Sequence, residues 1–124
     1  KERRTPNMEF QICTTVSIFN IFSLAKIAFW VKQYQPKFFY VNTLFDPDYF
    51  NIQTLPKNVK NIVNSRYNML TDFKPTLRFM NSVDRDSPEI RKQRSDRILQ
   101  TDAYRHENFG EYFPLLNKVL GIYE

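Results

Sequence analysis

Cysteine and histidine, side chains that can act as nucleophile and general base, occur once each in this sequence, as Cys13 and His106. The two could act as a catalytic pair only if the fold brought them together. Cys13 lies in an apolar stretch, where a cysteine more often serves as inert packing. A metal site needs several converging ligands, which one histidine in a helical tail does not supply. The residues therefore predict neither a catalytic nor a metal centre, and we expect His106 at the surface.

Arginines form the next pattern with chemical meaning. The chain has 18 basic and 13 acidic side chains, a net charge of +5, and Arg91, Arg94 and Arg97 recur at every third position. Such a stripe could bind phosphates, so a nucleic-acid-binding module is one alternative. Glu89 and Asp96 interleave the stripe and interrupt its positive surface. We therefore interpret the arginines as a solvated helix face, which makes nucleic acid the lesser alternative.

Composition bounds the class of protein. The 124 residues are 42% apolar and 16% aromatic, which is typical of one folded domain. Two glycines, Gly110 and Gly121, are too few for a glycine-rich phosphate loop. The longest apolar stretch, residues 21–31, is too short to cross a bilayer, and no signal-peptide core is evident. With a single cysteine and no disulfide framework, we expect a cytoplasmic protein without a membrane partner.

The elements that must position these side chains begin with a βαβ unit. β-Branched and aromatic residues predict a strand over residues 10–20, and apolar residues at helical spacing predict a helix over residues 22–34. Residues 37–45 are apolar at nearly every position, which suits a strand covered on both faces in a parallel sheet. The sequence therefore predicts an α/β fold.

The rest of the chain is expected to be helical. Prolines and polar residues predict an extended loop over residues 46–56. Prolines near helix starts and apolar periodicity then predict three or four helical segments, at about residues 56–70, 74–83, 88–104 and 112–120. We accordingly divide the chain into an α/β part, residues 1–55, and a helical C-terminal extension, residues 56–124.

Four segments in this order carry a resemblance to a known family: TTVSIFN, FWVKQY, VNTLFDPDYFNIQTLPKNVK and TDAYRHENFGEYFPLL. Their order and spacing, over residues 10–116, resemble the C-terminal portion of phage-type radical S-adenosylmethionine (SAM) proteins, often described as twitch domain-containing. The resemblance implies a partial (β/α)6 barrel in which a four-iron four-sulfur (4Fe-4S) cluster binds SAM and generates a 5′-deoxyadenosyl radical. This chain would supply the fifth and sixth strands and the helical extension.

The cluster itself is where the sequence departs from the family. The family holds its cluster with a Cys-x3-Cys-x2-Cys loop, and some members carry further cysteines in the twitch region. One thiol, Cys13, cannot supply such a ligand set. The resemblance therefore implies a piece of an enzyme, catalytically silent alone, whose partner is a missing N-terminal barrel half or another subunit. The parent enzyme would use SAM, a 4Fe-4S cluster and a peptide or small-molecule substrate.

Four residues at the expected ends of the two strands are implied to line the SAM cavity: Ser17, Asn20, Asn42 and Leu44. They would contribute shape and hydrogen bonds, because the radical chemistry belongs to the cluster. The alternative is that the serine and the asparagines cap strand ends or neighbouring helices, as these residues commonly do. Leu44 fits a core position as well as a ligand contact.

The pattern Asp102-x2-Arg105-x2-Asn108-Phe109 is the sharpest match in the tail, and we interpret it as structural. Asp102 and Arg105 are spaced to pair on one helix. Asn108 and Gly110 suit the turn that ends it. Phe109 and Phe113 are expected to anchor the last helix in the core.

A non-catalytic interaction module is the remaining alternative. Two parallel strands form a poor independent sheet, since an exposed edge must be covered or it recruits other strands. The aromatic-rich chain could therefore serve to dock a partner.

Overall fold

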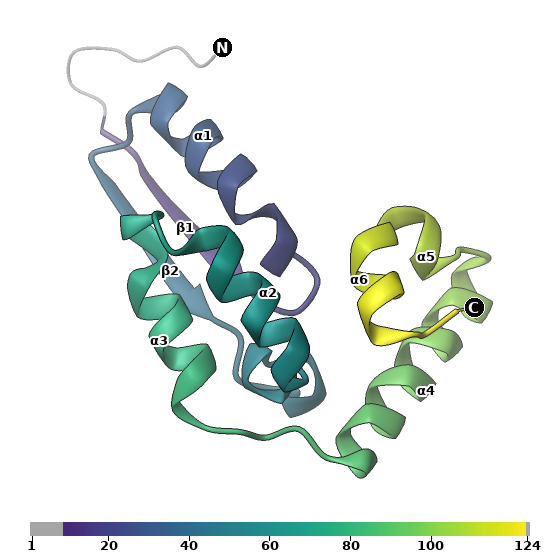
Figure 1. Ribbon diagram of the computed structural model, residues 1–124. Coiled ribbons are helices and arrows are strands. Elements are labelled where there is room, and N and C mark those ends of the chain that lie inside the picture. The colour runs from purple at the N-terminus through teal and green to yellow at the C-terminus, as the bar shows by residue number, and fades with distance from the viewer. Residues whose placement is uncertain (1–8, 124) are drawn as a thin grey trace.

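The computed structural model describes residues 9–123 and is mixed α/β, with more helix than strand (Figure 1). The first eight residues of the predicted α/β part, and Glu124, lie outside this range. Two parallel strands, β1 (Gln11–Val16) and β2 (Phe38–Thr43), are joined by helix α1 (Leu24–Tyr34). The predicted βαβ unit is confirmed.

Strand β1 is shorter than the predicted strand over residues 10–20. The side chain of Asn20 causes this, because its Nδ2 donates to the Thr15 carbonyl and its Oδ1 accepts from the Ser17 N–H, both at 2.9 Å. The chain turns between these residues and enters a 3₁₀ turn at Ile21–Ser23, directly before α1. The β-branched residues continue up to Asn20, but the strand ends earlier because the Asn20 side chain closes a turn there.

The expectation that β2 is covered on both faces is wrong. Side chains of β2 alternate between the two faces of the sheet, and Phe38 and Tyr40 are 46% and 48% exposed. Phe39 and Val41, on the opposite face, pack against the core. One face of the sheet is therefore covered by helices and the other is open. An apolar run alone does not distinguish these two situations.

Helices α2 (Lys57–Tyr67) and α3 (Lys74–Ser82) cover the sheet together with α1 (Figure 1). The predicted loop before α2 contains two 3₁₀ turns, Asp48–Phe50 and Ile52–Thr54, and a third, Thr71–Phe73, precedes α3. Apolar side chains of these elements make up most of the core, among them Val16, Ile18, Leu24, Ile52, Leu55, Val59, Val63, Phe73 and Met80, all without exposed surface.

Helix α4 (Pro88–Arg105) begins and ends with recognisable caps. Ser87 precedes it, and its hydroxyl accepts from the Ile90 N–H at 3.1 Å. The helix ends at His106, which is exposed and adopts the left-handed conformation with φ of 56°. The surface position predicted for His106 is confirmed. The prediction that Asn108 ends this helix is wrong, because Asn108 instead caps the next helix by accepting from the Gly110 N–H.

The last predicted helix, residues 112–120, corresponds to a helix over residues 114–120, and a short helix directly before it was not predicted. Helix α5 (Phe109–Tyr112) is followed by α6 (Pro114–Leu120), and Pro114 occupies the first turn of α6. A proline is tolerated there because its missing N–H would be unpaired in any case. The residue before it, Phe113, is thereby kept out of the helical conformation and separates the two helices.

Aromatic rings join these last helices to the sheet end of the molecule. Phe19 lies 4.7 Å from Phe50 between ring centroids, 5.4 Å from Phe113 and 6.0 Å from Phe109. The anchoring role predicted for Phe109 and Phe113 is confirmed. One buried core continues from β1 to α6, across the predicted boundary at residue 55. The division of the chain into two parts there stays a prediction.

Candidate functional site

The uncovered side of the sheet is the first candidate surface. It presents six exposed residues, which we call the open face: Gln11, Cys13, Thr15, Phe38, Tyr40 and Asn42. The strand register sets Cys13 beside Tyr40 and Thr15 beside Asn42. Asn42 Nδ2 donates to Cys13 Sγ at 3.0 Å. A polar pair and aromatic rings thus share one surface that the described chain leaves uncovered.

Two of the four residues predicted to line a SAM cavity are on strand β2 or directly after it. Asn42 belongs to the open face, next to Cys13. Leu44 follows β2, is partly buried, and its N–H extends the ladder by donating to the Val16 carbonyl at 2.8 Å. The alternation of side chains places Leu44 on the side of Asn42.

The other two, Ser17 and Asn20, lie in the turn after β1. Ser17 Oγ accepts from the Phe19 N–H at 3.2 Å, and Asn20 holds the turn through Thr15 and Ser17. These are the local capping contacts that the alternative interpretation of the two residues predicts. Their part in a cavity, like that of Asn42 and Leu44, stays a prediction.

Cys13, Thr15 and Tyr40 are open-face residues that sequence reasoning missed as site residues. The signal that could have identified them is the two-residue period of a strand, which places alternate side chains on the same face. Asn42 and Tyr40 are two positions apart, and the parallel register then brings Cys13 and Thr15 to the same side. Selecting residues by their place at a strand end gave only one member of this face.

A buried polar loop stands behind the ends of the strands. Asn51, Gln53 and Thr54 are buried and satisfy one another's polar groups or those of the backbone. Gln53 Nε2 donates to the Phe79 carbonyl of α3 at 2.9 Å, and Gln53 Oε1 accepts from Arg85 Nε at 2.9 Å. The loop therefore ties α3 to the segment that leads into α4.

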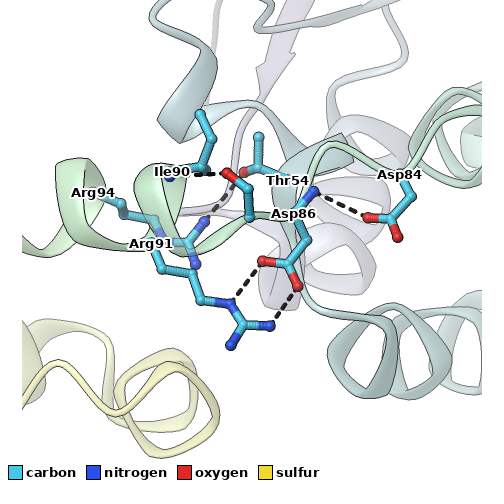
Figure 2. A network of polar contacts seen from close by, with 7 residues as sticks. Thr54, Asp84, Asp86, Ile90, Arg91 and Arg94 are labelled. Atoms are coloured by element: carbon cyan, nitrogen blue, oxygen red, sulfur yellow. Dashed lines mark hydrogen bonds and ion pairs between the residues drawn. The ribbon is translucent and has the colours of Figure 1, made fainter.

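The interpretation of the arginine stripe as a solvated face is wrong for Arg94, which is 2% exposed. Its Nη1 donates to Thr54 Oγ1 at 3.2 Å, while its Nε lacks a hydrogen-bond partner among residues 9–123 (Figure 2). Burial lowers the pKa of Arg94, and the negative charge of Asp86 acts in the opposite direction. A buried guanidinium without a paired carboxylate costs desolvation energy. The burial of Arg94 therefore lowers the stability of the folded state.

Asp86 connects α4 to the preceding segment. Arg91 Nε donates to Asp86 Oδ1 at 2.7 Å, and a second bond from the same guanidinium makes the pair bidentate (Figure 2). The hydrogen bonds from Arg91 lower the pKa of Asp86. Lys60 of α2 lies nearby, donates to the Val83 carbonyl at 3.2 Å, and has its pKa lowered by burial. We call Thr54, Lys60, Asp86, Arg91 and Arg94 the polar joint, because they fix the start of α4.

The second candidate surface is a groove of about 500 Å³ beside α4, which we call the α4 groove. Phe19, Phe50, Phe109 and Phe113 contribute aromatic rings to it, and Arg97 and Arg105 contribute cations. The groove thus combines an apolar floor with charged groups at its rim.

The predicted pair between Asp102 and Arg105 is absent from the described ion pairs. Asp102 Oδ2 instead accepts from the Phe109 N–H and from the Tyr123 hydroxyl, both at 2.7 Å. The hydrogen bond to Asp102 raises the pKa of Tyr123. Asp102 therefore holds α5 and the chain end against α4, which is a structural role but with different partners from those expected.

Within residues 9–123, His, Cys, Asp and Glu side chains form no cluster that could hold a metal ion. None of the helices in that range has the length and apolar character to cross a membrane. Comparisons with protein-family models, with curated proteins and with solved structures find no match to this chain.

Proposed function

We propose that this chain supplies two strands of the partial barrel of a radical SAM enzyme, with the open face turned towards the SAM and substrate cavity. The observation that carries the proposal is the one-sided cover of a parallel sheet. α1, α2 and α3 lie on one face, and the opposite face is exposed from end to end. A strand in a (β/α) barrel has helices on its outer face and the barrel interior on its inner face.

The chemistry of the open face supports a cavity wall. Barrel interiors that form packed cores use mainly Val, Ile and Leu, whereas this face carries Cys13, Thr15, Tyr40 and Asn42. Within the described residues, the Tyr40 hydroxyl and the side-chain Oδ1 of Asn42 have no hydrogen-bond partner. Both are available to a ligand. In this proposal Asn42 and Leu44 contact SAM, and Ser17 and Asn20 shape the strand end beside it.

Apolar side chains on α1 support a missing neighbour on the outer side as well. Phe29 and Trp30 are 66% and 48% exposed, although they belong to a helix that packs on the sheet. In the outer ring of a barrel, adjacent helices cover such flanks. The outer edge of β1 also pairs with no further strand within residues 9–123, and the fourth strand of a partial barrel would cover that edge.

The cluster would come from outside this sequence. One cysteine cannot hold a 4Fe-4S cluster, which needs several thiolates. In the proposal the Cys-x3-Cys-x2-Cys loop belongs to an N-terminal barrel half, on the same polypeptide or on a partner subunit. The SAM cleavage and the radical reaction, on a peptide or small-molecule substrate, need both parts.

Reading the coding region upstream of Lys1 tests the proposal. We expect an in-frame segment that encodes the three-cysteine loop, and we expect the joined polypeptide, reconstituted anaerobically with iron and sulfide, to cleave SAM reductively. This chain alone should neither retain a cluster nor cleave SAM. A cluster assembled on this chain alone would contradict the proposal, as would an upstream region without the loop combined with no cluster-bearing partner.

The interaction-module alternative also uses the open face as the binding surface, but it predicts a different experimental result. It predicts a complex whose formation needs no cluster and produces no SAM cleavage. The nucleic-acid alternative loses its main support, because Arg94 is buried and Arg91 pairs with Asp86. Among the three arginines of the stripe, Arg97 alone is both exposed and without an ion pair to a described residue, and one cation is a small electrostatic footprint.

A further inference from the structure

The α4 groove lies beyond the carboxyl ends of the two strands. Phe19 follows β1 by three residues, and Phe50 belongs to the 3₁₀ turn Asp48–Phe50 that follows β2. Ligands of open α/β sheets and of (β/α) barrels bind at this end of the strands. The groove is therefore in the part of the fold where a ligand is expected, although none of the four residues predicted to line a SAM cavity belongs to it.

The floor of the groove is a cluster of aromatic rings. Phe19 packs edge-on to Phe50 at 4.7 Å, and Phe109 stacks on Phe113 at 5.2 Å with 29° between the ring planes. Phe109 is buried, whereas Phe19, Phe50 and Phe113 keep partly exposed surface. Such surface favours a flat apolar group, which can lie against the rings or meet them edge-on.

Two arginines on α4 provide the charge at the rim. Arg97 and Arg105 are eight residues apart, which corresponds to about 12 Å along a helix. Both side chains are exposed, and neither guanidinium forms a hydrogen bond or ion pair with another residue in the described range. A guanidinium offers a fork of donors that matches a carboxylate or a phosphate. The rim therefore offers unpaired donors that an anionic group can bind.

The acidic residues of the groove make the two arginines differ in their availability to an incoming anion. Asp102 is three residues from Arg105, and Glu107 two residues, so Arg105 shares its surroundings with two carboxylates. Asp102 is also occupied by the Phe109 N–H and the Tyr123 hydroxyl. Arg97 lies a full turn or more away from both acids along the chain. An incoming anion is therefore expected to pair chiefly with Arg97.

We propose that the α4 groove binds a small organic anion, with a flat apolar body on the phenylalanine floor and a carboxylate or phosphate on Arg97. The volume of about 500 Å³ falls within the roughly 300–1,000 Å³ typical of small-molecule sites. This site goes beyond the proposed barrel role and needs neither the cluster nor SAM. Its failure would leave the barrel proposal untouched.

Titration of the ¹⁵N-labelled full chain with 1-naphthoate and 1-naphthyl phosphate, followed by amide NMR, tests the site. We expect saturable shifts at groove residues such as Thr101 and Phe109 with both anions, and the tighter of the two identifies the anionic group. The matched cation, 1-naphthylmethylamine, should bind at least tenfold more weakly. Equal binding of the anions and the cation would overturn the proposal, as would shifts confined to the open face.

Charge variants provide the second arm. Arg97→Gln should weaken naphthoate or naphthyl phosphate binding about tenfold, because it removes a charge-assisted hydrogen bond from an exposed position. Arg105→Gln should have a smaller effect, and the matched control Arg78→Gln, exposed on α3 and outside the groove, should have none. Unchanged affinity in Arg97→Gln would also overturn the proposal.

Discussion

The two halves of the molecule differ in how much of their surface is covered by packing within the chain. The sheet with α1, α2 and α3 buries one side and leaves the open face and the outer flank of α1 exposed. Helices α4 to α6 are instead held by the polar joint (Figure 2) and by the packing of Phe109 and Phe113 on Phe19. Residues 9–123 therefore attach the helical end to the rest of the fold but leave one face of the sheet uncovered, and for this reason we propose that a partner binds at the sheet.

The largest expected effect comes from removing the ring that fastens the helical end. Phe109 is 3% exposed and packs on Phe19 and Phe113. Phe109→Ala should lower the free energy of unfolding by about 3–5 kcal/mol, measured by urea denaturation. The matched control is Tyr112→Ala in the same helix, where the ring is 64% exposed and the expected change is within about 0.5 kcal/mol. Similar losses in both variants would contradict the anchoring role.

A neighbouring pair on β2 separates the two faces of the sheet. Phe39 packs on Phe73 at 6.0 Å on the covered face, and Tyr40 lies on the open face. Phe39→Ala should destabilise by about 2–3 kcal/mol, at the low end for a phenylalanine because the ring is only partly buried. Tyr40→Ala should change the free energy of unfolding by less than about 1 kcal/mol. An equal or larger loss for Tyr40→Ala in thermal denaturation would show that the open face is covered.

The polar joint should tolerate removal of its buried charge better than removal of the charge's partner. Thr54→Val leaves Arg94 buried without its hydrogen bond and should cost about 1–3 kcal/mol. Arg94→Met keeps the volume and removes the desolvated cation, so it should be neutral or stabilising, as replacements of buried ions often are. Urea midpoints of the two variants give the comparison. A larger loss for Arg94→Met would mean that the charge itself stabilises the joint.

The smallest expected effect is the pH dependence of the Asp86 pair. Because the bonds from Arg91 lower the pKa of Asp86 in the folded state, the pair stabilises the fold when Asp86 is ionised. The stability difference between the wild type and Asp86→Asn should be full above about pH 5 and should shrink below the unfolded-state pKa of about 3.9.

Its size should stay near or below about 1 kcal/mol, since Arg91 is half exposed. Asp96→Asn, which removes an exposed pair with Lys92, is the control, with an expected change of a few tenths of a kcal/mol. A difference for Asp86→Asn that grows as the pH falls would contradict the sign.

Local patterns in the sequence predict most of the elements. Proline positions and apolar spacing predict helices over residues 74–83 and 88–104, and the structure has α3 at Lys74–Ser82 and α4 at Pro88–Arg105. The order of strand, helix and strand likewise predicts the parallel pair. These features depend on neighbouring residues and on backbone chemistry, which a single sequence contains.

Features that depend on distant contacts could not be predicted in the same way. Arg94 is buried because Thr54, forty residues earlier, lies beside it, and its position in an arginine stripe gives no sign of this. The cover of one face of β2, and not the other, depends on where three helices pack. The α4 groove combines residues from β1's end, the loop after β2, α4 and α5, so no local motif predicts it.

The most direct test of the central claim uses the single native thiol, because Cys13 lies on the open face and is exposed. Its rate of alkylation by iodoacetamide would be measured in this chain alone and in the complex with a cluster-bearing barrel half, with and without SAM. Gln100→Cys in a Cys13→Ser background, exposed on α4 and away from the sheet, corrects for general changes in reactivity. The account predicts fast labelling of Cys13 alone, slower labelling in the complex and further protection by SAM. Equal rates in all three states would contradict it.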